Sequence, residues 1–251
     1  MSADAATSVA ERARRDLARL TPNEKRAAQR LLADYPVAGF DSYVAFQKAL
    51  RAELAAQRET PLMKGSGFSA DDQLGRFAEA TIANIRESVA NVARGEFDAI
   101  VSLLADRNRP VHVLGGRFTD PIADYMVAHL RVLRPQVRRI TGQRIGWLDQ
   151  LLDVGKRDVF VLFDIRRYSD DLAHLAKEAA KRGATVTLFT DQWLSPISKV
   201  ARHVLPVRVV VPSIWDSSAG LLLLVEALLS AIAAELGPVA RNRLTAIETM
   251  R

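Results

Sequence analysis

Cysteine is absent from the 251 residues. Disulfides, thiolate zinc sites and a cysteine nucleophile are therefore excluded, and the absence agrees with a reducing compartment such as the cytoplasm. The four histidines are scattered and show no metal-binding spacing such as HExxH, so the sequence predicts neither a metal site nor a cofactor. Dinucleotide-binding, P-loop and nucleophile-elbow motifs are missing as well, and no group of residues demands catalysis.

Long hydrophobic runs are also scarce. The first twenty residues, MSADAATSVAERARRDLARL, contain no apolar core of a secretory signal. The longest apolar run covers residues 219–234, is interrupted by Glu226 and is short for a membrane span. We interpret it as a buried or dimer-facing helix and expect a cytoplasmic chain with no membrane partner.

Charge of one sign is in modest excess, with a net charge of +6, which permits nucleic-acid or phosphate binding without requiring it. Residues 1–60 contribute little, because their ten basic side chains face eight acidic ones. The densest basic cluster has no acidic residue within it and comprises Arg131, Arg134, Arg138, Arg139 and Arg144. We interpret it as a solvated helix end and strand edge.

The first part of the chain is predicted to be helical. Apolar spacing favours helices over residues 8–19, from Pro22 to just before Pro36, and over residues 43–57, where the middle one opens with a capping box of Thr21 and Glu24. The segment ETPLMKGSGFS then reads as a linker because it is rich in Pro, Gly and Ser. The predicted division is a helical domain over residues 1–58, a linker over 59–70 and a second domain over 71–251.

The second domain is predicted to be α/β. Two helices between residues 70 and 107, broken near Arg94, precede a regular alternation of short apolar runs and helical segments. The expected strands cover residues 111–114, 137–141, 159–164, 185–189 and 203–207. Such alternation predicts an open five-stranded parallel sheet flanked by helices.

Ligands of parallel sheets usually bind at the carboxyl ends of the strands, so the loops there are the first places to look for a site. One candidate is the turn GGRFT of residues 115–119, where glycines and a helix N-terminus suit a phosphate; a tight turn capped by Thr119 is the alternative. A second is the basic loop Asp164–Ser169, whose alternative is a charged surface loop. The loop at residues 190–193 completes this set.

Glu226 is unusual because it is a carboxylate inside an apolar helix. Three interpretations stay open for it: a position facing the ligand crevice, a pair across an interface, and a partly exposed edge. His112 and His203 fall in or beside predicted strands and are expected to be core histidines.

Two segments together resemble a known family: VHVLGGRFTDPIADYMVAHL and DVFVLFDIRRYSDDLAHLAKEAAKRGATVTLFTDQWLSP. They are similar to the sugar isomerase (SIS) domain of RpiR-type bacterial transcriptional regulators, over roughly residues 75–250. The resemblance implies a domain that binds phosphorylated sugars, acts as an effector sensor and forms homodimers or tetramers. The segment LTPNEKRAAQRLLADYP also resembles the first helix of the family's helix-turn-helix, and GFDSYVAFQKALRAEL its closing helix.

The loops depart from the family patterns G-x-G-x-S and S-x-S-G-x-T. Thr119 stands at the first loop's serine, Asp164 and Arg166 at the second loop's serines, Arg167 at its glycine, and Ser169 at its threonine. The hydroxyl-rich phosphate cradle has become a basic loop, which still suits a small anionic metabolite. The residues expected to bind such an effector are Gly115, Gly116, Thr119, Asp164, Arg166, Arg167 and Ser169.

The helix-turn-helix is incomplete as written, because only Val37, Ala38 and Gly39 stand where the family has its second and recognition helices. No DNA-binding residue can be assigned. Three hypotheses follow: an effector-sensing, DNA-binding regulator that is not an enzyme; a sensor or interaction protein without sequence-specific DNA binding; and a sugar-phosphate isomerase, for which Glu226 is the only candidate base.

Overall fold

The computed structural model describes residues 72–250 and, before them, residues 48, 49, 52, 55, 60 and 64. The chain divides into two compact units, Met1–Thr60 and Pro61–Arg251. The predicted helical domain and its incomplete helix-turn-helix lie outside the described residues, apart from the scattered positions named above. The described sheet and its helices all belong to the second unit.

This unit alternates strands and helices, as its sequence predicts. Its helices and strands are α5 (Gln73–Asn91), α6 (Arg94–Ala105), β1 (Val111–Gly115), α7 (Asp120–Leu133), β2 (Val137–Arg139), β3 (Val159–Asp164), α8 (Asp170–Lys181), β4 (Thr185–Asp191), β5 (His203–Val207), α9 (Ala219–Leu236) and α10 (Pro238–Thr249). Short 3₁₀ turns at Arg144–Trp147 and Asp149–Leu151 lie between β2 and β3, and another at Pro196–Lys199 lies between β4 and β5.

The five strands form one sheet in the order β2-β1-β3-β4-β5, and every neighbouring pair is parallel. The predicted five-stranded parallel sheet is therefore confirmed. From β1 the chain moves outward to β2 and then returns to the other side of β1 to form β3. This reversal creates a topological switch point between β1 and β3, where their carboxyl ends leave a crevice.

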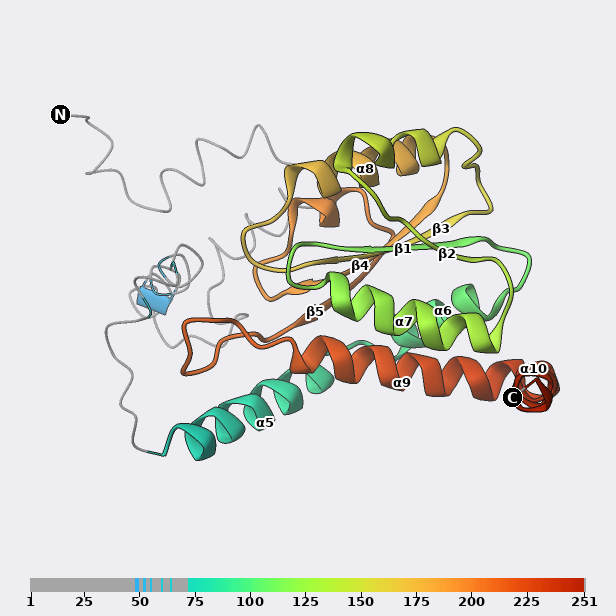
Figure 1. The fold of residues 1–251 in the computed structure, drawn as a ribbon. Helices are drawn as coiled ribbons and strands as arrows, with labels where there is room; N and C mark the ends of the chain where they lie inside the picture. Colours follow the sequence, from blue (N-terminus) through green and yellow to red (C-terminus); the bar gives the residue numbers. More distant parts are fainter. Residues whose placement is uncertain are drawn as a thin grey trace. The chain divides into compact units, whose positions relative to one another are not determined.

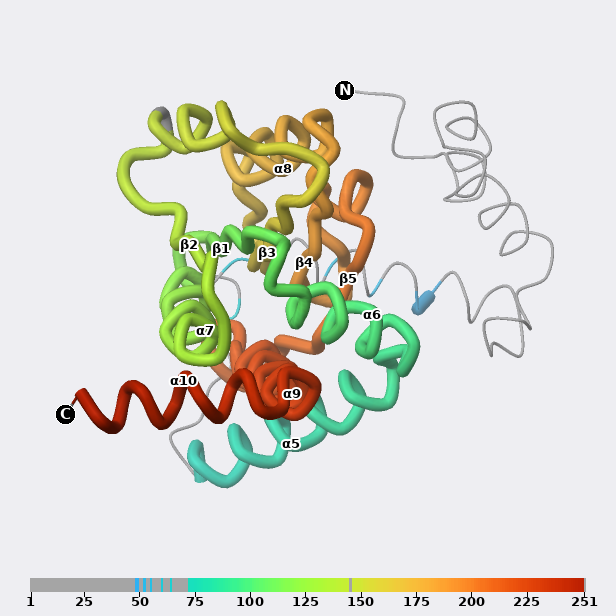
Figure 2. The backbone as a smooth tube through the Cα atoms, turned by 90° about the vertical axis from the view of Figure 1, so that its right-hand side faces the viewer, coloured from blue at the N-terminus to red at the C-terminus, as the bar shows by residue number. Residues whose placement is uncertain are grey.

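Helices cover both faces of the sheet (Figure 1). The side view in Figure 2 places α8 on one face and α7 and α9 on the other. Alternate residues of the fully buried strand β3 serve the two layers: Val161 belongs to the core beneath α7 and α9, and Phe160 and Leu162 belong to the core beneath α8. A strand buried on both faces explains why its sequence is an unbroken apolar run.

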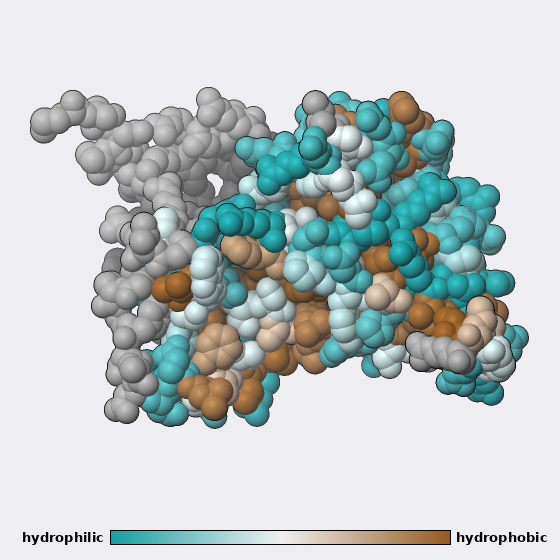
Figure 3. Space-filling model, viewed as in Figure 1, coloured by the Kyte–Doolittle hydropathy of each residue, from teal (hydrophilic) through white to brown (hydrophobic). Residues whose placement is uncertain are grey.

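Helix α9 is the apolar segment noted in the sequence, and by length and composition it could cross a membrane. In this unit it packs against α5, α6 and α7, and its inward face, including Leu221, Val225 and Leu228, is buried. Helix α5 is more open, with Leu74, Ile82 and Val89 exposed. In Figure 3 the apolar side chains visible on this face gather toward α5 at the lower left.

The side chains of two arginines of the basic cluster, Arg134 and Arg139, are shielded from solvent, so the prediction that the cluster is solvated is wrong for them. Arg134 is completely buried, and burial lowers the pKa of its guanidinium to about 10. It donates hydrogen bonds to the carbonyl oxygens of Leu104, Arg109 and Pro135, which satisfy its charged fork. Arg139 forms ion pairs with Asp120 and Asp124. These acceptors could not be predicted from the sequence. Backbone carbonyls carry no sequence signal, and the two carboxylates that pair with Arg139 belong to the preceding helix.

The histidines follow their expectation in part. His112 is buried, stacks on Phe160 and lies 2.7 Å from an Asp158 carboxylate oxygen. His203 lies on the edge strand β5 with 12% of its side chain exposed, and its ring faces the Glu96 carboxylate at 3.2 Å. The interpretation as a core histidine is confirmed for His112, whereas His203 lies at the margin of the core.

Candidate functional site

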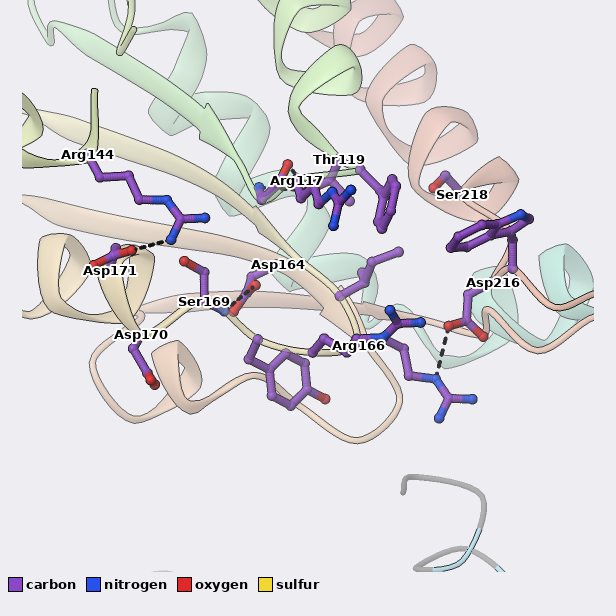
Figure 4. A pocket seen from close by; sticks show the side chains of 16 residues that line it. Arg117, Thr119, Arg144, Asp164, Arg166, Ser169, Asp170, Asp171, Asp216 and Ser218 are labelled. Carbon is purple, nitrogen blue, oxygen red and sulfur yellow. Dashed lines mark hydrogen bonds and ion pairs between the residues drawn. The ribbon is translucent and has the colours of Figure 1, made fainter. Parts of the chain in front are cut away.

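A pocket of about 600 Å³ opens at the carboxyl ends of β1 and β3, at the switch point of the sheet. Its walls come from the β1–α7 loop, the β3–α8 loop, the start of α8, Arg144, and residues 215–218. Figure 4 shows two ion pairs on opposite sides of the view, with Ser169 and Asp164 between them. Its size falls within the usual range for small-molecule sites.

The β1–α7 loop, residues 116–119, is closed mainly by neutral groups, and the Asp120 carboxylate beside it accepts from the Gly115 N–H at 3.1 Å. The Thr119 hydroxyl donates to the carbonyl of Phe163 at 2.8 Å and accepts from the Gly116 N–H at 2.9 Å. That N–H also donates to the carbonyl of Phe163 at 2.8 Å. Thr119 occupies the N-cap position of α7, but its side chain makes no capping hydrogen bond. These hydrogen bonds join the β1–α7 loop to the end of β3, so the groups that form them are already occupied within the protein.

Gly115 supports the same turn by its small size. A Cβ atom at this position would lie 2.5 Å from the backbone nitrogen of Asp120, closer than real contacts allow. At Gly116 the nearest atom to an added Cβ is the Thr119 hydroxyl at 3.5 Å, an ordinary contact. Only the first glycine of the pair is therefore required by packing.

The β3–α8 loop, residues 165–169, is anchored by two buried carboxylates. Asp191, at the end of β4, accepts from the Arg166 N–H and the Tyr168 hydroxyl, both at 2.7 Å, and from the Trp193 N–H at 3.0 Å. Asp164 accepts from the Ser195 hydroxyl at 2.5 Å and from the Ser169 N–H at 3.3 Å. Both acids are almost fully buried, so the loop depends on charged acceptors inside the protein.

Burial shifts the titration of two groups here. It raises the pKa of the Asp164 carboxyl above its usual range, although the hydrogen bonds from Ser195 and Ser169 act in the opposite direction. Burial also raises the pKa of the Tyr168 phenol far above its usual range, and the hydrogen bond to Asp191 adds to the rise. Tyr168 is therefore a neutral hydrogen-bond donor and not a proton-transfer group at neutral pH.

Two consecutive arginines in this loop have left-handed backbone conformations, with φ of 35° at Arg166 and 42° at Arg167. Such values are uncommon for residues with a Cβ atom. Arg167 stands where the resembling family has glycine, so the turn keeps a glycine-like shape with an arginine in it. The buried anchors on either side maintain this conformation.

Among the described residues, four arginines line the pocket, and two of them are held in ion pairs. Arg166 approaches Asp216 at 3.1 Å and stacks over the Trp193 ring, with 4.2 Å between the guanidinium carbon and the ring centroid. Arg144 contacts Asp171 at 2.6 Å (Figure 4). The other two, Arg117 and Arg167, are exposed and have no ion pair with any described residue.

Residues 208–218, here called the strap, connect β5 to α9 and complete the pocket with Trp215, Asp216 and Ser218. Helix α5 holds the strap through polar side chains. Gln73 and Asn84 donate to strap carbonyls at 2.7 Å, and the Arg208 N–H donates to the Ser88 hydroxyl at 2.8 Å. Asp216 also receives Lys64 at 2.6 Å. The strap therefore contacts both the pocket and the residues that precede the sheet.

Six of the seven residues expected to bind an effector line this one pocket: Gly116, Thr119, Asp164, Arg166, Arg167 and Ser169. The seventh, Gly115, lies beside it in a smaller neighbouring cavity. Thr119 and Asp164 are buried and engaged within the protein, whereas Ser169 caps α8 by accepting the Leu172 N–H and keeps its own hydroxyl hydrogen for another partner.

Glu226 does not reach the pocket. It is exposed on α9 and accepts from the Tyr125 hydroxyl at 2.9 Å. Among the described residues no group of three His, Asp or Glu side chains is placed to hold a metal ion. The described part of the pocket lining contains no histidine.

Sequence reasoning missed several lining residues, and for different reasons. Arg117 and Phe118 stand within the predicted loop but do not belong to the family pattern. Trp215 and Asp216 follow β5 in a segment without a motif, and only the folded strap brings them to the pocket. Asp191 lies in the third loop proposed from the sequence, and its role as an internal anchor has no local signal.

Residues 103–231, just over half of the chain, match the SIS domain family. No curated protein sequence matches the chain. Among solved structures, the sugar isomerase domain of an RpiR transcription factor from Sphaerobacter thermophilus has a TM-score of 0.65 and 23% identity, and the match covers 70% of this chain and 98% of that one. The Vibrio vulnificus NanR protein complexed with ManNAc-6P has a TM-score of 0.62 at 14% identity, with 96% and 97% covered.

Enzymes share this fold too. A phosphoheptose isomerase from Francisella tularensis has a TM-score of 0.55 and 17% identity, with 66% of this chain and 98% of that chain covered. At these identities the likeness to solved structures is one of fold. The family match is independent of it and agrees with the observed sheet and switch-point pocket. The chain belongs to the SIS domain family.

Proposed function

We propose that the pocket at the switch point binds a small anionic, sugar-phosphate-like metabolite, and that the chain is an RpiR-type transcriptional regulator whose DNA binding responds to it. The observation that carries the proposal is the pair of exposed arginines, Arg117 and Arg167, which lie on two different loops of one pocket without an ion-pair partner among the described residues. Guanidinium groups are suited to bidentate contacts with phosphate or carboxylate.

The surrounding groups favour binding over catalysis. Aldose–ketose isomerisation needs a general base at the substrate. Asp164 is buried against Ser195, while Asp171 and Asp216 are occupied by arginines, so Asp170 is the one remaining carboxylate among the described residues of the lining. Glu226, the candidate base of the isomerase hypothesis, lies outside the lining. Proteins of similar fold include both transcriptional regulators and an isomerase. The positions of these carboxylates support the role of a regulator over that of an isomerase.

The binding test uses titration calorimetry with pentose and hexose phosphates. Replacing Arg117 and Arg167 together by Ala should weaken binding by about 10-fold to 100-fold per lost contact, because a hydrogen bond to a charged group contributes about 1.5–3 kcal/mol. The control variant Arg94→Ala/Arg107→Ala removes the same charge from exposed positions outside the pocket and should bind normally. Equal affinity of the double variant and the unchanged protein would overturn the proposed site.

The regulatory part needs a separate test. Fluorescence anisotropy on DNA from beside the protein's own gene, with a random duplex as control, should show specific binding that changes when the effector is added. Equal, salt-sensitive binding to both duplexes would support the alternative, a sensor without sequence-specific DNA binding, which the three-residue junction Val37–Gly39 favours. Turnover of a sugar phosphate by the purified protein would instead support the isomerase hypothesis.

A homodimer is part of this proposal. The exposed apolar residues Leu74, Ile82 and Val89 on α5 offer a surface that a second copy could bury. Sedimentation analysis of the full chain, unchanged and with Ile82→Glu and Val89→Glu, tests this: the unchanged protein should dimerise and the variant should dissociate.

A further inference from the structure

Two aromatic side chains stand at the pocket with about half of their surface exposed: Phe118 is 54% exposed and Trp215 is 51% exposed. One comes from the β1–α7 loop and the other from the strap, and their ring centroids are 5.4 Å apart at an angle of 56°. Single exposed apolar side chains are ordinary, whereas several that lie together at a pocket mark a contact surface. Their meeting at a ligand pocket from distant parts of the chain points to an apolar binding wall.

The aromatic pair adjoins the cationic part of the pocket. The Arg117 guanidinium carbon lies 5.0 Å from the centre of the Phe118 ring, so the cation and the two rings are neighbours. Half-buried Ile165 adds a further apolar side chain to the lining. The pocket therefore joins an apolar wall, formed by Phe118, Ile165 and Trp215, to the anion-binding arginines Arg117 and Arg167.

The polar groups fit a plain sugar less well. Sugar hydroxyls are usually recognised by side chains that both donate and accept, yet the described lining contains no Asn, Gln or His. Its buried carboxylate, Asp164, is occupied by Ser195 and the Ser169 N–H, and Asp171 and Asp216 are held in ion pairs. Exposed Asp170 is the one carboxylate of the described lining that is left to accept from a sugar hydroxyl. The hydroxyls of Ser169 and Ser218 supply few further contacts. A volume of about 600 Å³ leaves room for a ligand larger than one sugar ring.

We infer that the ligand is an anion carrying a flat aromatic ring, of the chemical class of a nucleoside monophosphate. Its phosphate contacts Arg117 and Arg167, and its ring stacks on the wall formed by Phe118 and Trp215. Aromatic rings prefer offset or tilted stacking on such side chains, and every base has a face suited to it. This inference rests on the proposed function, because it concerns the same site and specifies its ligand.

The test compares matched probes by titration calorimetry on the full chain: AMP, GMP, CMP and UMP, which carry phosphate and ring; ribose 5-phosphate, which lacks the ring; and adenosine, which lacks the phosphate. At least one nucleotide should bind about 10-fold or more tightly than ribose 5-phosphate, in keeping with stacking of one base. Adenosine should bind more weakly than that nucleotide by a similar factor.

Variants of Trp215 test whether the aromatic wall causes the difference in affinity between nucleotide and ribose 5-phosphate. Trp215→Ala should bring the ratio of nucleotide to ribose 5-phosphate affinity close to one, and Trp215→Phe should restore much of the ratio. The control Leu152→Ala removes an apolar side chain that is 78% exposed and outside the pocket, and should leave the ratio unchanged. Circular dichroism and sedimentation of each variant establish that fold and oligomeric state are retained.

The outcomes separate this inference from the proposed function. If ribose 5-phosphate binds and no nucleotide binds more tightly, the anion site stands and the aromatic-ligand inference is overturned. The inference is also overturned if Trp215→Ala leaves the ratio unchanged and alters only the oligomeric state, since the rings then serve a protein contact. If the Arg117/Arg167 double variant affects no probe, the proposed site itself falls.

Discussion

The two loops of the pocket occupy equivalent places after β1 and β3, yet they are built in opposite ways. The β1–α7 loop closes with a threonine hydroxyl, backbone groups and a glycine that packing requires. The β3–α8 loop has no glycine, holds two arginines in left-handed conformations and is anchored by buried Asp191 and Asp164. A neutral hydroxyl and a buried carboxylate can thus close the same kind of turn.

The difference has an energetic meaning. A loop closed by backbone and hydroxyl groups makes ordinary hydrogen bonds and carries little charge into the core. A loop closed by carboxylates takes charged groups out of water, which is favourable only while their hydrogen bonds remain complete. The second loop should therefore be more sensitive to mutation and to pH than the first.

The largest expected effect follows from removing its main anchor. Asp191→Ala leaves the Arg166 N–H, the Tyr168 hydroxyl and the Trp193 N–H without their acceptor, and each unsatisfied buried donor costs about 1–3 kcal/mol. We expect the free energy of unfolding in urea to fall by about 3 kcal/mol or more. The exposed neighbour Asp170 is the control, and Asp170→Ala should change it by less than about 1 kcal/mol. Similar small losses for both variants would remove the contrast between the loops.

A glycine exchange tests the other loop. Gly115→Ala forces a Cβ atom against the Asp120 backbone, and overpacking of this kind costs about 1–3 kcal/mol. Gly116→Ala meets only ordinary contacts and should be nearly neutral. Thermal unfolding of both variants measures the difference. If the two exchanges cost the same, the close approach at Gly115 does not determine this turn.

A smaller effect should come from relieving backbone strain. Arg167→Gly places a residue without Cβ at a φ of 42°, and we expect a gain of up to about 1 kcal/mol in unfolding free energy. Arg117 is also exposed and has no ion pair with a described residue, but it has no positive φ, so Arg117→Gly should lose about 0.5–1 kcal/mol. A loss at both positions would mean that the anchors have removed the strain.

The smallest effect concerns pH. Since burial raises the pKa of folded Asp164 above that of the unfolded chain, its contribution to stability is fully present below the ordinary Asp pKa and is lost as pH rises through the folded pKa. Asp164→Asn cannot titrate. The unfolding free energy of the unchanged protein, relative to this variant, should therefore increase as pH falls from about 7 to about 4. A constant difference across this range would show that the buried carboxyl titrates normally.

The sequence was sufficient for the sheet, because buried parallel strands have apolar runs and their helices have a separate period. It also placed six predicted site residues at one pocket, since loops after parallel strands converge. It could not reveal that Arg134 is buried, because the carbonyls that receive its guanidinium lie in other segments. Nor could it place Trp215 and Asp216, which lie in the strap that α5 holds by hydrogen bonds from Gln73 and Asn84.

The Asp216 carboxylate of the strap is shared by two cations. One oxygen pairs with Lys64 and the other pairs with Arg166, so the interaction energies of the two cations with this carboxylate are coupled. Whatever draws Arg166 toward a ligand changes the field that Lys64 experiences, and by thermodynamic reciprocity the reverse is equally true. Lys64, which precedes the sheet in the sequence, therefore influences how strongly Asp216 holds Arg166 at the pocket.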